Sequence, residues 1–339
     1  MDPRAFCTST RVLIVAGKGG VGKTTVSAVV AKMASDAGLR TLVVEIERRS
    51  GLGALFGHRG LLGYRETVLV PAGPGAAVGE VRGRTLTPDD ALVEYLDDHG
   101  MRRISRRLSR TGVVDVVATA VPGIKDILVL GKVKQLERGG RGEKLDPEEW
   151  SHPADLIVVD APAAGHAVTF LQSAKGLLDA VRVGPIRSQA QEVADLLGDP
   201  ARTGVMLVAL AEETPVNELI ETAYALEDRV GVHLTPVVVN AVYTRLEGLG
   251  IDPVEAARQA GVELDPRLLG PLRAAAAFRR QRQDLQAEQL ARLADALPLP
   301  QLQLPYVFSD RLGPPQLDQL VEALSSEVRK LPELARLCE

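Results

Sequence analysis

Few folds can accommodate the stretch GKGGVGKTT at residues 17–25. It follows the apolar, β-branched run RVLIVA (residues 11–16), which predicts a buried strand, and it precedes residues 26–38, whose small and apolar side chains recur at helical spacing. The stretch itself fits the pattern G-x-x-x-x-G-K-[ST] of loops that hold phosphate between a strand and a helix. The alternative, a glycine-rich turn with a chance lysine, is disfavoured by the flanking strand and helix.

Each residue type in this loop has a chemical reason. Glycines allow positive φ angles and close approach of the backbone, so that several N–H groups converge on an anion at the positive end of the following helix. We expect Lys23 to reach the β and γ phosphates of ATP, and the Thr24 hydroxyl to ligate the Mg²⁺ that bridges them. The residues expected to bind the nucleotide are Gly17, Gly19, Gly20, Val21, Gly22, Lys23, Thr24 and Thr25.

A second part of the same site is predicted at residues 154–171, ADLIVVDAPAAGHAVTFL. The apolar run predicts a buried strand that ends at Asp160, where a carboxylate would lie beside the metal of a phosphate site. Pro162–Gly165 would follow as a flexible turn able to sense the γ phosphate. His166 would either contact the nucleotide or a partner, or have a structural role at the start of a helix.

Another predicted strand, residues 40–45 (RTLVVE), ends in a charged cluster of Glu45, Glu47, Arg48 and Arg49. They would lie at the edge of the sheet where ligands bind in parallel α/β folds. Glu47 is the first acidic residue beyond this strand, and it is the candidate catalytic residue that orients the attacking water near the γ phosphate. The alternative is a solvated strand end without a catalytic role.

The rest of the chain predicts alternating strands and helices, and hence a single P-loop domain over residues 1–339 with a doubly wound, mostly parallel sheet. Further strands are expected at 66–72, 203–210, 234–240 and 301–304, and helices at 214–228, 256–297 and 315–331. Residues 88–137 interrupt the alternation as a helical insertion subdomain, and residues 138–153 would return to the sheet as a polar linker. Asn240, at the end of its strand, either contacts adenine or caps a turn.

Composition narrows the functional classes. The formal net charge of -4 argues against a general nucleic-acid-binding protein, which needs a dense basic surface. No apolar stretch approaches the roughly 20 residues that span a bilayer. The N-terminal residues also lack the pattern of a signal peptide, so we expect a cytoplasmic protein without stable membrane insertion. Arginines within residues 102–110 form a basic face, which is either solvated or a docking surface for an acidic partner or an anionic lipid.

Four stretches resemble the anion-transporting ATPase family, which contains the arsenical pump ATPase and the ATPase that targets tail-anchored membrane proteins. They are GKGGVGKTT, PGIKDILVLGKVKQLE (residues 122–137), VVDAPAAGHAVTFLQ (residues 158–172) and VVVN (residues 237–240). In this family the additional lysine of the loop, here Lys18, reaches the nucleotide of the facing subunit. The resemblance therefore implies a dimer that encloses two ATP molecules. The chain looks most like an actinobacterial-type branch, which implies a homodimer or a heterodimer with a paralogue, and a protein client.

The chain also departs from this family. Where the family has an Asp-Pro-Ala-His-Asn switch, residues 47–51 read Glu-Arg-Arg-Ser-Gly, which leaves Glu47 to position water and predicts slow hydrolysis. The zinc-binding CxxC and the arsenite-binding cysteines of family members are missing from the sequence. We therefore predict a dimeric, Mg²⁺-dependent ATPase whose helical insertion opens and closes on hydrolysis. A nucleotide-gated binding module with little turnover and a membrane-associated partitioning ATPase are the alternatives.

Overall fold

The computed structural model describes residues 1–46, 51–74, 78–98, 123–139 and 154–332. Within them one nine-stranded sheet has the order β3-β4-β2-β5-β1-β6-β8-β9, and β7 pairs with β6. All neighbouring strands are parallel except β3 and β4. The strands are β1 (Val12–Gly17), β2 (Thr41–Ile46), β3 (Thr67–Val70), β4 (Val81–Leu86), β5 (Leu156–Ala163), β6 (Thr203–Leu210), β7 (His233–Leu234), β8 (Val237–Val242) and β9 (Gln301–Pro305). The predicted α/β class with a mostly parallel sheet is confirmed.

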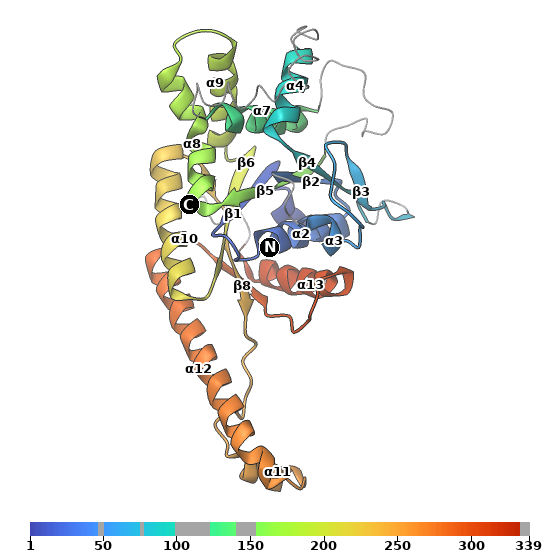
Figure 1. Ribbon diagram of the computed structural model, residues 1–339, viewed down its shortest axis with the longest axis vertical. Helices are drawn as coiled ribbons and strands as arrows, with labels where there is room; N and C mark the ends of the chain where they lie inside the picture. The colour runs from blue at the N-terminus through green and yellow to red at the C-terminus, as the bar shows by residue number, and fades with distance from the viewer. Residues whose placement is uncertain (47–50, 75–77, 99–122, 140–153, 333–339) are drawn as a thin grey trace.

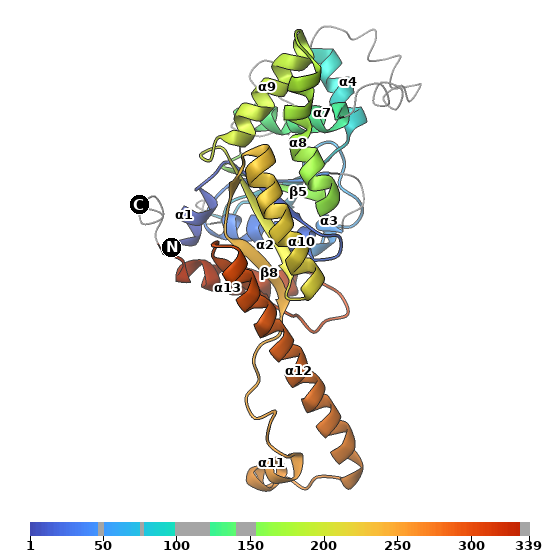
Figure 2. The same ribbon diagram turned by 90° about the vertical axis from the view of Figure 1, so that its left-hand side faces the viewer.

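Helices cover both faces of this sheet (Figures 1 and 2). One face carries α1 (Pro3–Cys7), α2 (Lys23–Asp36), α3 (Leu52–Leu55) and α13 (Pro314–Lys330). The other face carries α8 (Ala164–Ala180), α9 (Pro185–Gly198), α10 (Glu213–Ala225) and the π-helix η2 (Leu226–Val230). At one end of the molecule α4 (Pro88–Asp98) and α7 (Ile124–Arg138) gather with α9, and at the opposite end lie α11 (Pro253–Ala260) and the outer part of α12 (Pro266–Ala296).

Strand β1 shows how the sheet divides the core. Val12 and Ile14 belong to one buried apolar cluster, whereas Leu13 and Val15 belong to the other. Successive side chains of a strand point to opposite faces, so both faces of the sheet are buried at β1. The continuous apolar run in the sequence is the consequence of this double burial. The strand predicted at residues 11–16 is found one residue later.

Strand β4 was not predicted, because its sequence VRGRTL carries two arginines and a glycine. Arg84 is nevertheless only 2% exposed. Its guanidinium lies 4.6 Å from the centre of the Tyr64 ring and 3.9 Å from the Glu66 carboxylate. A buried arginine is compatible with a strand when a ring and a carboxylate surround it in this way.

Strand β5 continues past Asp160 to Ala163 and passes directly into α8. It pairs with β1 as far as Ala163, which lies opposite Gly17. The flexible turn predicted at Pro162–Gly165 is therefore wrong: its first two residues belong to the strand and its last two to the helix. The backbone pairing with β1 extends the strand beyond the point at which the apolar run stops.

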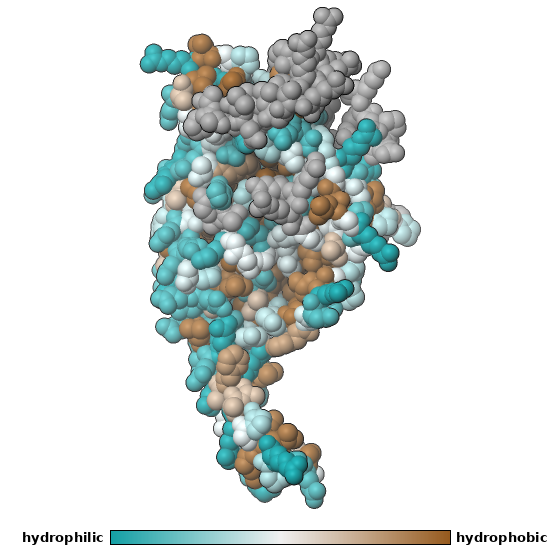
Figure 3. Space-filling model, viewed as in Figure 1, coloured by the Kyte–Doolittle hydropathy of each residue, from teal (hydrophilic) through white to brown (hydrophobic). Residues whose placement is uncertain are grey.

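The helical block predicted at residues 256–297 is divided into α11 and α12. Gly261 ends α11 with a positive φ of 66°, and the Asp265 side chain caps the first turn of α12. Together α11 and the outer part of α12 project from the body as an arm (Figures 1 and 2). Figure 3 shows apolar side chains at the end of this arm. Exposed apolar residues in these two helices and in the segments next to α11 include Ile251, Val254, Val262 and Leu268.

The predicted helical insertion is represented by α4 and α7. Gly123 precedes α7 in the left-handed conformation, in agreement with a helix that opens at this glycine. Residues 99–122 and nearly all of the predicted linker 138–153 lie outside the described residues. Along the part of the chain that the structure describes, no helix is both long enough and apolar enough to cross a membrane.

Candidate functional site

The glycine loop connects the end of β1 to the start of α2, as the sequence predicts. Gly22 has a φ of +94°, and a methyl group there would lie 2.2 Å from Nδ2 of Asn240. A methyl group at Gly17 would lie 2.3 Å from the carbonyl oxygen of Val208 on β6. Both positions therefore require glycine. The loop leads to the N-terminus of α2, where free N–H groups and the helix dipole favour an anion.

The other loop residues divide between solvent and core. Gly19 and Gly20 are exposed, whereas Val21 is 1% exposed and packs in the apolar cluster around α2. Thr25 is half buried in the first turn of α2. The structure thus leaves the middle of the loop accessible and anchors its end through Val21.

Lys23 is the first residue of α2, and its side chain folds back over the loop. Its Nζ donates a hydrogen bond to the carbonyl oxygen of Lys18 at 3.0 Å. Burial lowers the pKa of Lys23 from its usual value, and the nearby Asp160 carboxylate acts in the opposite direction. The ammonium group is therefore held above the loop, where a phosphate chain would lie.

Asp160 meets the first turns of α2 through two hydroxyl groups. Thr24 Oγ1 donates to Asp160 Oδ2 at 2.7 Å, and Ser27 Oγ donates to Oδ1 at 3.4 Å. Asp160 is 6% exposed, and burial is the main reason why its pKa is raised from 3.8 to about 6. The bonds from Thr24 and Ser27 limit this rise. The strand end and the helix start that the sequence predicts separately are in direct contact.

These groups fit a magnesium ion. Carboxylate and hydroxyl oxygens are the ligands that Mg²⁺ prefers, together with water and substrate phosphates. Burial leaves the ionised Asp160 carboxylate poorly solvated, which raises its pKa, and a bound cation would stabilise it. Thr24 and Asp160 are therefore suitable ligands for the metal of a nucleotide complex.

Glu45, which the sequence places in the charged cluster at the strand end without a role of its own, is a neighbour of this site. It is 1% exposed, and its backbone lies opposite Asp160 in the register of β2 and β5. Its carboxylate accepts a hydrogen bond from Thr85 Oγ1 at 2.9 Å and contributes to the raised pKa of Asp160. A glutamate that closes the apolar run RTLVVE was the available signal.

The Asn240 side chain contacts the glycine loop. Its Nδ2 donates to the carbonyl oxygen of Val21 at 3.0 Å, so β8 is tied to the loop directly. The next residue, Ala241, has a positive φ of 56°, which no other non-glycine residue shows in the described part of the chain. The pairing of β8 with β9 shifts at this point, between Val239 and Val242.

An aromatic cluster lies just beyond Asn240 and was not predicted. The ring centres of Tyr243 and Tyr306 are 5.1 Å apart, and those of Tyr306 and Phe308 are 4.7 Å apart. The Arg279 guanidinium lies 4.0 Å from the centre of the Tyr243 ring, and Phe308 is 75% exposed. Such a partly exposed surface suits stacking with a planar group. Its members come from the ends of two strands and from α12, so no local pattern reveals it.

Lys18 has a partner within its own chain. Its Nζ lies 2.5 Å from Oε1 of Glu218 on α10, and both side chains are 37% exposed. Exposed ion pairs contribute at most about 1 kcal/mol, so this contact can exchange for a stronger one. Of the other candidates, His166 is exposed in α8, and Glu47 lies outside the described residues.

Two comparisons agree with this geometry. Residues 12–331 match the family described as CobQ/CobB/MinD/ParA nucleotide binding domain. The chain is 32% identical to ATPase BagA of Mycobacterium tuberculosis over 335 residues, which cover 94% of each protein. It is 25% identical to the arsenical pump-driving ATPase of Escherichia coli over 256 residues, 69% of this chain and 40% of that relative. Relatives consistent with the anion-transporting ATPase family thus match this chain either over nearly its whole length or over about two thirds of it.

Proposed function

The chain belongs to the family of CobQ/CobB/MinD/ParA nucleotide-binding domains, and from this premise we propose that it binds and hydrolyses ATP with Mg²⁺. The observation that carries the proposal is the 2.7 Å contact between Thr24 and Asp160 at the start of α2. It joins a hydroxyl group of the phosphate loop to a buried carboxylate of the neighbouring strand. Burial disfavours the ionised form of this carboxylate, as its raised pKa indicates. A purely structural loop would not need such a group at this position.

In the proposed reaction the chain supplies binding and positioning. The loop N–H groups and the Lys23 ammonium bind the β and γ phosphates and stabilise the charge that develops on them. Thr24 and Asp160 would hold Mg²⁺, which would supply positive charge to offset the negative charge of the phosphates. Glu47 orients the attacking water. The adenine base would lie on the side of Asn240 and of the cluster formed by Tyr243, Tyr306, Phe308 and Arg279.

The active form is proposed to be a dimer, either of two copies or with a paralogue. Lys18 exchanges its bond to Glu218 for the nucleotide of the facing subunit. This proposal is supported by the weakness of an ion pair between two partly exposed side chains. A conformational change around Asp160 would reach the end of the molecule formed by α4, α7 and α9 through α8, which begins directly after β5. Opening and closing of that end would act on a protein client.

A titration of ATP in the presence of Mg²⁺, monitored by calorimetry, tests the binding step. The Lys23→Ala variant is expected to lose at least about 100-fold in affinity, because it removes the ammonium group above the loop. Lys175→Ala is the matched control, since Lys175 donates to the carbonyl oxygen of Arg229, away from the loop. Equal ATP affinity of the Lys23→Ala variant and the wild type would contradict the proposal.

A nucleotide-gated binding module with little turnover is the second candidate. It is favoured by the position of Glu45, which is 1% exposed and accepts a hydrogen bond from Thr85, so that this carboxylate is unsuited to activate water. The Glu47→Gln variant separates the two functions. An ATPase that uses Glu47 loses turnover and keeps ATP binding, whereas the binding module shows no turnover to lose.

A further inference from the structure

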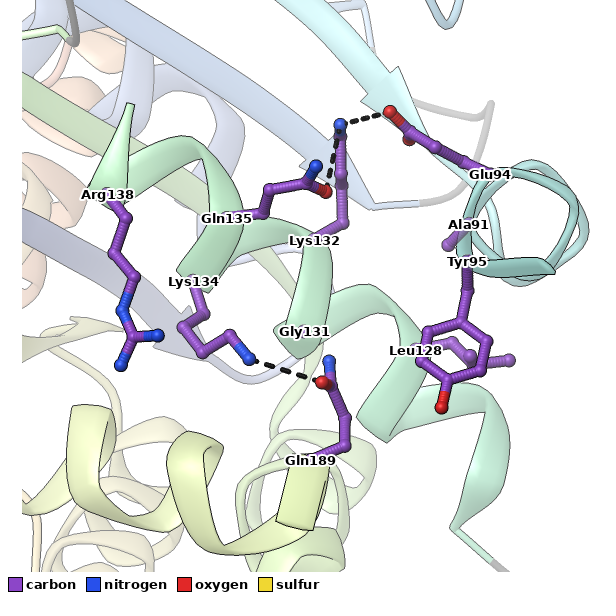
Figure 4. A pocket seen from close by; sticks show the side chains of 10 residues that line it. All are labelled: Ala91, Glu94, Tyr95, Leu128, Gly131, Lys132, Lys134, Gln135, Arg138 and Gln189. Carbon is purple, nitrogen blue, oxygen red and sulfur yellow. Dashed lines mark hydrogen bonds and ion pairs between the residues drawn. The ribbon is translucent and has the colours of Figure 1, made fainter. Parts of the chain in front are cut away.

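A cavity of about 580 Å³ lies between α4, α7 and α9, at the end of the molecule away from the arm. Figure 4 shows the side chains that line it. Its volume is within the range of small-molecule sites, about 300–1,000 Å³. The described residues that line it include Ala91, Tyr95, Leu128, Lys134, Arg138 and Gln189.

The lining is apolar at one end and cationic at the other. Leu128 and the Tyr95 ring lie at one end in Figure 4, and Lys134 and Arg138 lie at the opposite end. Gln189 lies between the two ends, with its side chain against α7. A cavity with these two ends matches a ligand that has an apolar part and a charged group.

Lys134 is the most constrained cation of the cavity. Its side chain is only 9% exposed, and its Nζ donates to Gln189 Oε1 at 3.2 Å and to Glu192 Oε2 at 2.8 Å. Glu192 also accepts a bond from Arg138 at 3.1 Å, so one carboxylate serves two cations. The hydrogen bond from Lys134 is the main reason why the pKa of Glu192 lies below its usual value. The carboxylate is therefore ionised, and its Oε2 accepts from both cations.

The third cation is neutralised separately. Lys132 donates to Glu94 on α4, which also accepts a bond from the Tyr64 hydroxyl. Among the described residues around the cavity, two carboxylates thus face three cations. Ammonium and guanidinium groups carry more N–H donors than these acceptors occupy. Within the described residues, positive charge and N–H donors are therefore both left over at the end formed by Lys134 and Arg138.

Gly131 holds the cavity in this shape. A methyl group there would lie 1.9 Å from Nε2 of Gln189. Glycine within a helix is less favourable than alanine. At this position it lets Gln189 lie against the backbone of α7 and accept the bond from Lys134. Lys134 is therefore held by packing between two helices and is not an exposed surface lysine.

We propose that this cavity binds a small organic anion. Its carboxylate or phosphate group bonds to Lys134 and Arg138, and its apolar part packs on Leu128 and Tyr95. The ligand supplies the acceptor oxygens that the cations lack, in a site where charge-assisted hydrogen bonds are strong because water is partly excluded. This site is separate from the nucleotide site and does not depend on the function proposed for it.

Calorimetry with the full chain tests the proposal, with phenylacetate and phenylphosphate as probes and phenylacetamide as the neutral control. The titrations contain excess Mg²⁺ and ADP, so that the glycine loop cannot account for binding of the phosphate probe. We expect at least one of the two anions to bind once per chain, and phenylacetamide to bind at least about tenfold more weakly.

Two variants and a control locate the binding. Lys134→Met removes the buried ammonium, and Ala91→Phe fills part of the cavity without changing its charge. Each variant is expected to lower the affinity for the anion at least about tenfold. Lys175→Met is the matched control on α8 and is expected to bind like the wild type. The proposal is overturned if neither anion saturates the protein at about 5 mM, if phenylacetamide binds equally well, or if both cavity variants bind like the wild type.

Discussion

The glycine loop and the cavity between α4, α7 and α9 are both suited to anions, but they are built differently. The loop uses backbone N–H groups from consecutive residues, and glycine is required at Gly17 and Gly22 because the backbone of the loop is crowded. The cavity uses side chains of three helices, with Lys134 at its cationic end. A site of the first kind is specified by a short sequence, whereas a site of the second kind depends on how distant helices pack.

The largest effect is expected on ATP affinity when a required glycine of the loop is replaced. Gly22→Ala should weaken ATP binding by more than about 100-fold, because the left-handed φ and the 2.2 Å contact with Asn240 both force the loop to move. Gly176→Ala is the matched control in α8, where no atom lies within 4 Å of the added methyl group. That control should bind ATP normally and gain roughly 0.5–1 kcal/mol in stability. Wild-type ATP affinity in Gly22→Ala would show that the loop geometry is not required.

The next effect concerns the buried carboxylate of the loop site. The pKa of Asp160 is raised to about 6, so without metal the folded state loses stability as the pH rises from about 4 to 6. Asp160→Asn should therefore stabilise the metal-free protein by about 2 kcal/mol at pH 8 and have little effect at pH 4. Urea unfolding at both pH values measures this. A variant that is less stable than the wild type at pH 8 would contradict the account.

A smaller effect is expected for the corresponding glycine of the cavity. Gly131→Ala moves Gln189, which is the end of a flexible side chain rather than backbone, and alanine is the better helix former. The net change in stability should stay below about 1 kcal/mol, and ATP affinity should not change. Thermal unfolding and ATP titration measure the two quantities. A loss of ATP binding would mean that the two sites are not independent.

The smallest effect on stability is expected at Lys18. Glu218→Gln removes its partner within the chain and should change the free energy of unfolding by less than about 1 kcal/mol, since both side chains are partly exposed. It should, however, increase the fraction of dimer in the presence of ATP, because Lys18 no longer has to leave a carboxylate. Light scattering measures this fraction, and a decrease would assign Glu218 to the dimer contact instead.

The sequence was sufficient for the parts of the molecule that depend on local order. The loop, Thr24 and Asp160 were predicted because each residue type is needed at a fixed place after a strand or before a helix. Strand β4 was missed because the ring of Tyr64 and the carboxylate of Glu66 make its buried arginine acceptable, and neither is local to it. The continuation of β5 to Ala163 depends on its pairing with β1.

Other features could not be predicted for the same reason. The bond from Asn240 to the loop joins residues that are far apart in the chain, and an asparagine at a strand end is compatible with many roles. The aromatic cluster and the cavity each combine segments that come together only in the folded protein. Lys132, Lys134 and Arg138 are visible in the sequence as charges on a helix, and only the packing of α4 and α9 places them around a cavity.

The central claim, a dimeric ATPase with Lys18 acting across the interface, is tested most directly by steady-state ATP hydrolysis over a range of protein concentrations, with mass measured by light scattering in the same samples. The account predicts that turnover per subunit rises with the fraction of dimer, and that Lys18→Ala abolishes this rise while ATP still binds. Turnover that is independent of dimer formation, or a folded and ATP-bound dimer without turnover, would contradict it.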